Sequence, residues 1–475
     1  MKRIVSILII SLLTLSFTGC GATAFDPEAW LGLSSPEAAS EEVSEAPVVA
    51  TPTPEPVMEV LPEDQAMEAL SDNTVSEDVV TYEPVTIVFA GDINFDPHYA
   101  NMNSLRSRGG EIADGVDEEI INELVSADIA MINNEFPYST RGTPTPNKKF
   151  TFRSSPESVR YMTDMGIDIV GLANNHAYDH GPDALLDTLD TLSGAGIKYV
   201  GAGRNIEEAM TPEYFEIGGM KIAFTAATQI ERSLPPDTKE ATETEPGVLR
   251  TLDPEKYLEV IRTADENADF TIAFVHWGSE NVYKYEAAQT ELAEKYAEAG
   301  ADLIIGAHPH VIQGFDYIGD VPVVYSMGNF WFSSKTLDSC IIKATLYEGK
   351  LQDVQFIPCV QKGCFTSMKH EGDGEYERII GQEATRSSER ATITRDGFIV
   401  KAGSVSAEED AKSDHVPDNM GTPEAGAADT TAVPAPDAAV IPEGVLPEGT
   451  DPAAQPAAEQ PAADQPADPA LQPVQ

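Results

Sequence analysis

Short apolar runs alternate with amphipathic segments along the middle of the chain. Eight of these runs predict β-strands, and several are apolar at nearly every position, which is typical of strands covered on both faces. The predicted strands are residues 85–90, 129–132, 167–172, 197–200, 222–226, 271–275, 303–305 and 323–325. Helical periodicity between the strands predicts helices at residues 117–126, 156–165, 182–192, 254–267 and 287–299. This alternation indicates an α/β fold built in layers.

Two further apolar runs, residues 341–346 and 351–357, lie on either side of a short polar turn. They predict a β-hairpin, which we expect to add antiparallel strands to the sheet. Together these elements predict one folded domain over residues 84–403.

Polar side chains follow six of the predicted strands at the point where each strand ends. In open α/β sheets, ligands bind beyond the carboxyl ends of the strands, so we expect these side chains to meet at one site. They are Asp92, Asn94, Asn134, Glu135, Asn174, Asn175, His176, His276, His308, His310 and Asn329.

Carboxylate, amide and imidazole groups are the ligands that Mn, Fe, Zn or Mg ions accept in proteins. We therefore predict one or two divalent ions. The ligand candidates are Asp92, Glu135, Asn175, His276, His308 and His310. His176 is left as the catalytic acid or base, or as a donor to the transition state. The residues expected behind the ligands or against the substrate are Asn94, Asn134, Asn174, His180 and Asn329.

His308 and His310 are separated by one residue and directly follow a short apolar run. If the strand continued, its two-residue period would place both rings on the same side of the chain. For other candidates a structural role stays open at this stage. Asp92 could cap a turn, and Glu135 could be a helix cap or a surface carboxylate. Asn175 could order a loop, and His276 could be a hydrogen-bonded core residue.

The first 20 residues contain Lys2, Arg3, an apolar run at residues 4–17, and then Gly19 and Cys20. The apolar run is too short to span a membrane, so residues 1–20 are predicted to be a secretory signal. A Cys directly after a small residue resembles a bacterial lipoprotein signal. We therefore expect lipidation of Cys20 and attachment to the outer face of the bacterial cytoplasmic membrane. The alternative is that Cys20 is an ordinary residue of a cleaved peptide.

The formal net charge of −49 is concentrated in two flanking segments. Residues 21–83 contain no Lys or Arg, and residues 404–475 contain only Lys412. Both are rich in Ala, Pro and acidic residues, so we predict a disordered stalk and a disordered tail. The excess of acidic charge argues against nucleic acid as a partner. A bridge between Cys359 and Cys364 stays open, because the cysteine count predicts no disulfide framework.

Several of these motifs resemble those of the CapA-type family of poly-γ-glutamate capsule synthesis proteins. The matching segments are residues 90–92, 134–137, 172–181, 275–280, 306–314 and 325–330. The resemblance implies a fold similar to calcineurin-like metallophosphoesterases, which is a four-layer α/β/β/α sandwich. It also implies one ion on Asp92, Glu135 and His310, and another on Glu135, Asn175, His276 and His308. Asn94 stands where the superfamily has a ligand histidine, so the first ion lacks one ligand.

The resemblance further implies a role in a secreted anionic polymer. We expect a membrane-anchored, metal-dependent hydrolase or transferase that acts in capsule or poly-γ-glutamate biosynthesis. The alternative is a non-catalytic subunit that binds the polymer for assembly or export and keeps the metal pocket. The expected partners are the polymer itself, the membrane through the lipid anchor, and membrane-embedded polymer-synthase subunits.

Overall fold

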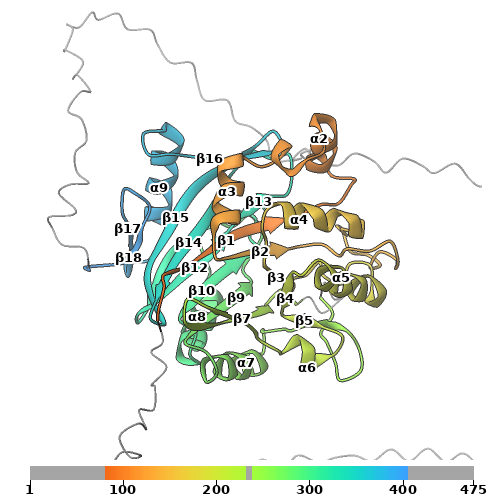
Figure 1. Cartoon of the computed structure of the whole chain (residues 1–475), viewed down its shortest axis with the longest axis horizontal. Coiled ribbons are helices and arrows are strands. Elements are labelled where there is room, and N and C mark those ends of the chain that lie inside the picture. The colour runs from red at the N-terminus through yellow and green to blue at the C-terminus, as the bar shows by residue number, and fades with distance from the viewer. Residues whose placement is uncertain (1–80, 232–237, 405–475) are drawn as a thin grey trace, which may run out of the picture. The chain divides into compact units, whose positions relative to one another are not determined.

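The computed structural model describes residues 81–231 and 238–404 (Figure 1). The predictions for the signal, the lipidation of Cys20, the acidic stalk and the acidic tail lie outside these residues. The domain boundaries at residues 84 and 403 stay predictions.

The first of two large sheets holds eight strands. Four of them run parallel in the order β1 (Val85–Ile93), β2 (Ile129–Asn134), β3 (Ile169–Gly171) and β4 (Lys198–Val200). On the other side of β1, antiparallel strands follow as β14 (Leu337–Tyr347), β15 (Lys350–Lys362) and β16 (Phe365–Met368). The short strand β13 (Asn329–Trp331) pairs with the end of β1. The predicted antiparallel hairpin is therefore confirmed as β14 and β15.

The second sheet holds six strands. Their order is β11 (Ile312–Ile318), β12 (Val321–Met327), β10 (Leu303–Ala307), β9 (Phe270–His276), β7 (Met220–Thr228) and β6 (Glu213–Ile217). The four central strands are parallel, and the strands at the two edges are antiparallel to their neighbours.

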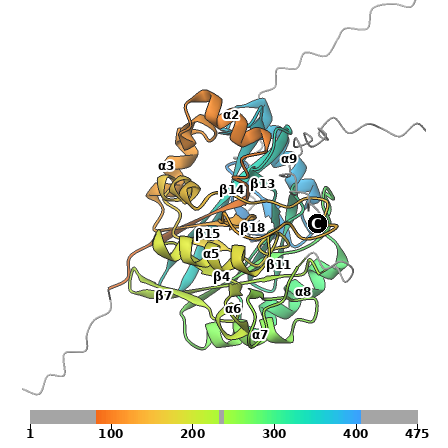
Figure 2. The same cartoon turned by 90° about the vertical axis from the view of Figure 1, so that its right-hand side faces the viewer.

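The two sheets face each other across the main apolar core. Phe89 of β1 and Phe224 of β7 meet there, with ring centroids 6.5 Å apart. On the outside of the first sheet lie α3 (Glu118–Ser126), α4 (Arg160–Asp164) and α5 (Pro182–Gly194). On the outside of the second lie α7 (Glu255–Asp265) and α8 (Ala287–Glu298), which form a second apolar cluster with it (Figures 1 and 2). The predicted four-layer α/β/β/α fold is confirmed.

Smaller elements complete the described residues. They are α2 (Ala100–Arg108), η2 (Ile112–Asp114), η3 (Pro156–Val159), α6 (Ile206–Ala209), α9 (Gly374–Arg386) and the strand pairs β5 (Ala202–Gly203) with β8 (Gly247–Val248) and β17 (Ala391–Ile393) with β18 (Ile399–Lys401).

All eight predicted strands and all five predicted helices overlap an observed element. The predicted helix at residues 156–165 begins as the 3-10 turn η3 before α4. Among the elements that the sequence pattern missed, β11 has Gln313, Gly314 and Asp316 within an otherwise apolar run. A Cβ at Gly314 would lie 2.4 Å from the backbone of Arg386, so this glycine serves the packing of β11 against the end of α9.

Cys359 and Cys364 are both free thiols, so the bridge that stayed open is not formed. Across residues 81–231 and 238–404, no helix combines the length and apolarity that a membrane crossing requires.

Candidate metal centre

The parallel strands of the two sheets end at the same edge of the sandwich, and the predicted site residues gather there. The first sheet supplies Asp92 at the end of β1, Glu135 directly after β2, and Asn175 and His176 after β3. The second sheet supplies the imidazoles of His276, His308 and His310.

The end of β1 is shaped by close contact with Gly328. A Cβ at Gly91 would lie 2.0 Å from the Gly328 carbonyl oxygen, so no larger residue fits at position 91 without a shift. This approach lets the Asp92 backbone N–H donate to the same oxygen at 2.9 Å. The Asp92 side chain is then held by Asn133, whose Nδ2 donates to Oδ1 at 2.7 Å.

His308 and His310 lie in a loop and not on a strand, because β10 ends at Ala307. Their backbone φ angles are 100° and 58°, in a region that residues other than glycine adopt rarely. The expectation that a strand period aligns the two rings is therefore wrong. The left-handed turn sends the rings to different neighbours: His308 packs against His276, and His310 packs against Phe332. Such rare backbone conformations often occur at functional sites.

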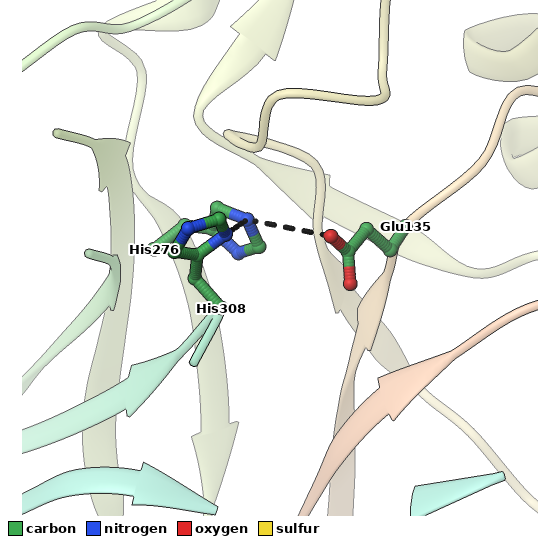
Figure 3. A group of neighbouring side chains, drawn as sticks. All are labelled: Glu135, His276 and His308. Carbon is green, nitrogen blue, oxygen red and sulfur yellow. Dashed lines mark hydrogen bonds and ion pairs between the residues drawn. The ribbon is translucent and has the colours of Figure 1, made fainter. Parts of the chain in front are cut away.

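The side chains form two groups that share one carboxylate. The inner group is Glu135, His276 and His308, and the outer group is Asp92, Glu135 and His310. In each group the candidate ligand atoms lie within 4.8 Å of one another. Figure 3 shows the inner group, where the two imidazoles face the carboxylate of Glu135 across the space between the sheets. The two groups match the ligand sets that the family resemblance implies, with Asn175 added to the inner one.

In the inner group, His276 Nε2 lies 3.6 Å from Glu135 Oε1, and His308 Nδ1 lies 3.1 Å from the same nitrogen. Asn175 Oδ1 is 2.8 Å from His276 Nε2, so its amide oxygen is directed into this group. In the outer group, His310 Nδ1 lies 3.1 Å from Asp92 Oδ2, and its Nε2 lies 3.9 Å from Glu135 Oε1.

Glu135 is fully buried, and neither carboxylate oxygen has a hydrogen-bond donor within the described part of the chain. Three imidazoles face Oε1, but each is 3.6 to 4.0 Å away, beyond hydrogen-bond distance. A buried carboxylate without donors is costly unless a cation neutralises it. This unsatisfied carboxylate, with nitrogen and oxygen donors around it, fits one or two divalent ions.

Without such ions, burial and the nearby Asp92 carboxylate raise the pKa of Glu135 well above its ordinary value. Burial and the neighbouring His308 lower the pKa of His276 well below its ordinary value. For His310, burial acts to lower the pKa, but Glu135 and Asp92 outweigh it and raise the pKa to about 9.

His176 stands beside the two groups. Its Nε2 lies 4.0 Å from Glu135 Oε1, and its Nδ1 lies 2.6 Å from Asp179 Oδ2. A carboxylate only accepts hydrogen bonds, so Nδ1 carries the proton and donates it to Asp179. Burial lowers the pKa of His176, and Asp179 opposes that effect. The Nε2 lone pair is therefore directed toward the candidate ligands.

The remaining predicted residues have different surroundings. Asn329 Oδ1 lies 2.9 Å from His310 Nδ1. Asn174 accepts from the His176 backbone N–H through Oδ1 at 3.0 Å and so shapes the loop. Asn94 Oδ1 accepts from the Asp96 backbone N–H at 2.8 Å, and Asn134 Nδ2 donates to the Phe136 carbonyl at 2.6 Å. His180 is buried beside the loop that contains Gly142.

Sequence reasoning missed several residues that contact the predicted ones. Asn133 reaches both Asp92 and His276, and Asp179 orients His176. Asp179 stands in a motif of the resemblance, so its acidic side chain three residues after His176 was an available signal. Phe152 lies against His176, with ring centroids 4.1 Å apart, and no pattern in the sequence indicated this contact.

Comparison with known proteins identifies a family and relatives with similar sequences. Residues 86–334 match the family described as bacterial capsule synthesis protein PGA_cap. The chain is 30% identical over 292 residues to the capsule biosynthesis protein CapA of Bacillus anthracis, covering 59% of this chain and 69% of that protein. It is 27% identical over 330 residues to the PGA biosynthesis protein CapA of Bacillus subtilis (strain 168), covering 68% and 82% respectively.

Two solved structures align with this chain at low sequence identity and with low TM-scores. A hypothetical protein from Thermus thermophilus is 14% identical and aligns over 60% of this chain and 100% of its own, with a TM-score of 0.36. The 5'-nucleotidase from Candida albicans is 11% identical and aligns over 56% of this chain and 47% of its own, with a TM-score of 0.31.

Proposed function

This chain belongs to the PGA_cap family of bacterial capsule synthesis proteins, and we propose that it is a metal-dependent hydrolase or transferase in capsule biosynthesis. The Bacillus anthracis relative is named for capsule biosynthesis and the Bacillus subtilis relative for PGA biosynthesis, which supports poly-γ-glutamate, or a similar anionic polymer of the cell surface, as the product of the pathway. The observation that carries the chemistry is Glu135, a buried carboxylate without donors that faces three imidazoles.

The inner and outer groups would each hold one divalent ion, with Glu135 shared between them and Asn175 completing the inner set. Mn, Zn, Fe and Mg all accept such oxygen and nitrogen donors. A divalent ion in a site of this kind supplies Lewis-acid chemistry, because it polarises a phosphoryl or carbonyl oxygen and makes water more acidic.

His176 is the proposed acid and base of the reaction. Asp179 holds the ring with Nδ1 protonated, which leaves Nε2 to take a proton from a nucleophile or, once charged, to give one to a leaving group. The pKa of His176 is lowered by burial, so the ring is neutral and ready as a base near pH 7. The face of Phe152 against the ring restricts the positions that the imidazole can adopt.

We also propose that the protein works outside the cytoplasmic membrane, anchored by a lipid on Cys20 and beside membrane-embedded polymer-synthase subunits. The charged start, apolar run and Gly19-Cys20 pair of the first 20 residues support this anchoring. Replacement of Cys20 by Ser should move the protein from the membrane fraction to the soluble fraction. Retention in the membrane fraction would contradict the lipid anchor.

Metal analysis and turnover on one preparation test the catalytic proposal. Purified protein that has been incubated with Mn, Zn or Fe should retain at least one equivalent of metal and hydrolyse a chromogenic phosphodiester or poly-γ-glutamate. The His176→Asn variant should keep the metal and lose most of the turnover. Less than one equivalent, together with no hydrolysis, would overturn the proposal and favour the non-catalytic polymer-binding subunit.

A further inference from the structure

Lys148 is less exposed to solvent than its neighbours in the loop that connects β2 to η3. Its side chain is only 6% exposed. The residues on either side, Asn147 and Lys149, are exposed, as is Phe150, at 48%. Residues 140–150 of this loop are mostly exposed, and within them the side chain of Lys148 is buried beside the candidate metal centre.

The buried ammonium bridges two points of the segment that follows β3. Lys148 Nζ lies 2.5 Å from Asp179 Oδ1, and it also donates to the backbone carbonyl of Asn175. Asn175 is a ligand candidate of the inner group, and Asp179 is the partner of His176. One charge therefore contacts both ends of the turn that includes His176.

Asp179 is fully buried and receives three donors. Oδ1 accepts from Lys148 Nζ, while Oδ2 accepts from the Phe152 backbone N–H at 2.7 Å and from His176 Nδ1 at 2.6 Å. Lys148 is the lysine partner of this carboxylate in a buried ion pair, with side chains 6% and 0% exposed. Lys148 thus fixes the position of the carboxylate that holds the His176 ring.

We propose that Lys148 is a positioning residue, which sets the places of Asn175 and His176 through the Asn175 carbonyl and the Asp179 carboxylate. This inference rests on the proposed function, because it gives Lys148 a role in the same site. The side chain is 6% exposed and contacts both of these groups, so we place its action on them.

Substitutions at Lys148 and at its exposed neighbour test this role in the full chain. Lys148→Met keeps most of the length of the side chain and removes its charge, Lys148→Arg keeps the charge, and Lys149→Met is the matched control. The measurement is the dissociation constant for Mn²⁺, obtained by competition with a chelator. Loss of an outer partner of a metal ligand typically weakens binding by about 10- to 100-fold, and we expect this for Lys148→Met.

Lys148→Arg should recover part of the lost affinity, and Lys149→Met should bind within about twofold of the unchanged protein, because its charge is in solvent. A residue that only fills space would be replaced well by Met. Equal Mn²⁺ affinity for Lys148→Met and the unchanged protein would therefore overturn the inference. If Lys148→Met does not fold, Lys148→Gln, which keeps a donor and removes the charge, is measured in its place with the same expected loss.

A metal-free measurement separates this inference from the proposed function. If the unchanged protein binds no Mn²⁺, the proposed function fails, and hydrogen exchange of residues 174–181 then tests Lys148 alone. Exchange in this segment should become at least about tenfold faster in Lys148→Met and stay unchanged in Lys149→Met. Unchanged exchange in both variants would overturn the positioning role.

Discussion

The inner and outer groups of the candidate metal centre share Glu135 but differ in their completeness. In the inner group, Glu135, His276 and His308 are all buried, and Asn175 adds a fourth donor. In the outer group the side chain of His310 is 16% exposed. Two sites that share a carboxylate are therefore not equivalent, and the inner one offers more donors with less access to water.

Asn94 explains part of this difference. It occupies the place where the resemblance expects a ligand histidine, and its Oδ1 is already used by the Asp96 backbone N–H. This hydrogen bond fixes the Asn94 amide oxygen in a local turn with its own backbone. The outer group is therefore left with three donors from Asp92, Glu135 and His310.

The two groups also differ in charge before any ion binds. Burial and the other imidazoles lower the pKa of His276, so its ring is neutral and presents a lone pair. His310 has its pKa raised to about 9, so it is a cation that pairs with the two carboxylates. The outer group thus carries its own positive charge, which an ion would have to replace, whereas the inner group does not.

Glu135→Gln should have the largest effect, because it removes the carboxylate that both groups share. We expect metal affinity to fall by more than about 1000-fold, beyond the effect typical of an outer partner. The amide keeps the shape of the side chain, so the fold should remain. Metal content after dialysis measures the outcome, with the exposed Glu157→Gln as control. If Glu135→Gln retains the ion, Glu135 is not the shared ligand.

Replacing one histidine in each group should weaken metal binding by unequal amounts. We expect His276→Asn to weaken the tighter ion by about 100-fold or more, and His310→Asn to leave that ion within about threefold while abolishing the weaker one. Titration calorimetry with Mn²⁺ measures the binding of both ions in one experiment. Equal losses in the two variants would show that the ions bind as one cooperative unit, and the contrast between the groups would disappear.

The gathering of these side chains was predictable from sequence because the candidate ligands are chemically distinctive and stand at the ends of apolar strands. Asp92, Glu135 and His276 each follow this rule, and parallel strands bring their ends to one edge. The strands themselves were predictable for a similar reason, since runs buried on both faces are almost wholly apolar.

Other parts of the site depend on contacts that no local pattern encodes. The buried position of Lys148 follows from the path of its loop, which is tied to the Asp179 carbonyl by the Thr145 backbone N–H at 2.8 Å. Lys149 has the same chemistry one residue later and is exposed. The left-handed turn at His308 and His310 could not be predicted from the sequence either, because neither residue is the glycine that normally signals positive φ.

The charge contrast predicts a steeper pH dependence for the weaker ion, because the raised pKa of Glu135 affects both ions and the raised pKa of His310 affects only this one. His310 is protonated below its pKa of about 9, and an ion needs its neutral ring, so binding of this ion must release one proton. Affinity should therefore rise by about tenfold per pH unit up to about pH 9 and level off above it. Calorimetry in two buffers of different ionisation enthalpy measures the released proton, and His310→Asn should abolish it. If the weaker ion bound with the same affinity at pH 7 and pH 9, His310 would not be the ligand that distinguishes the outer group.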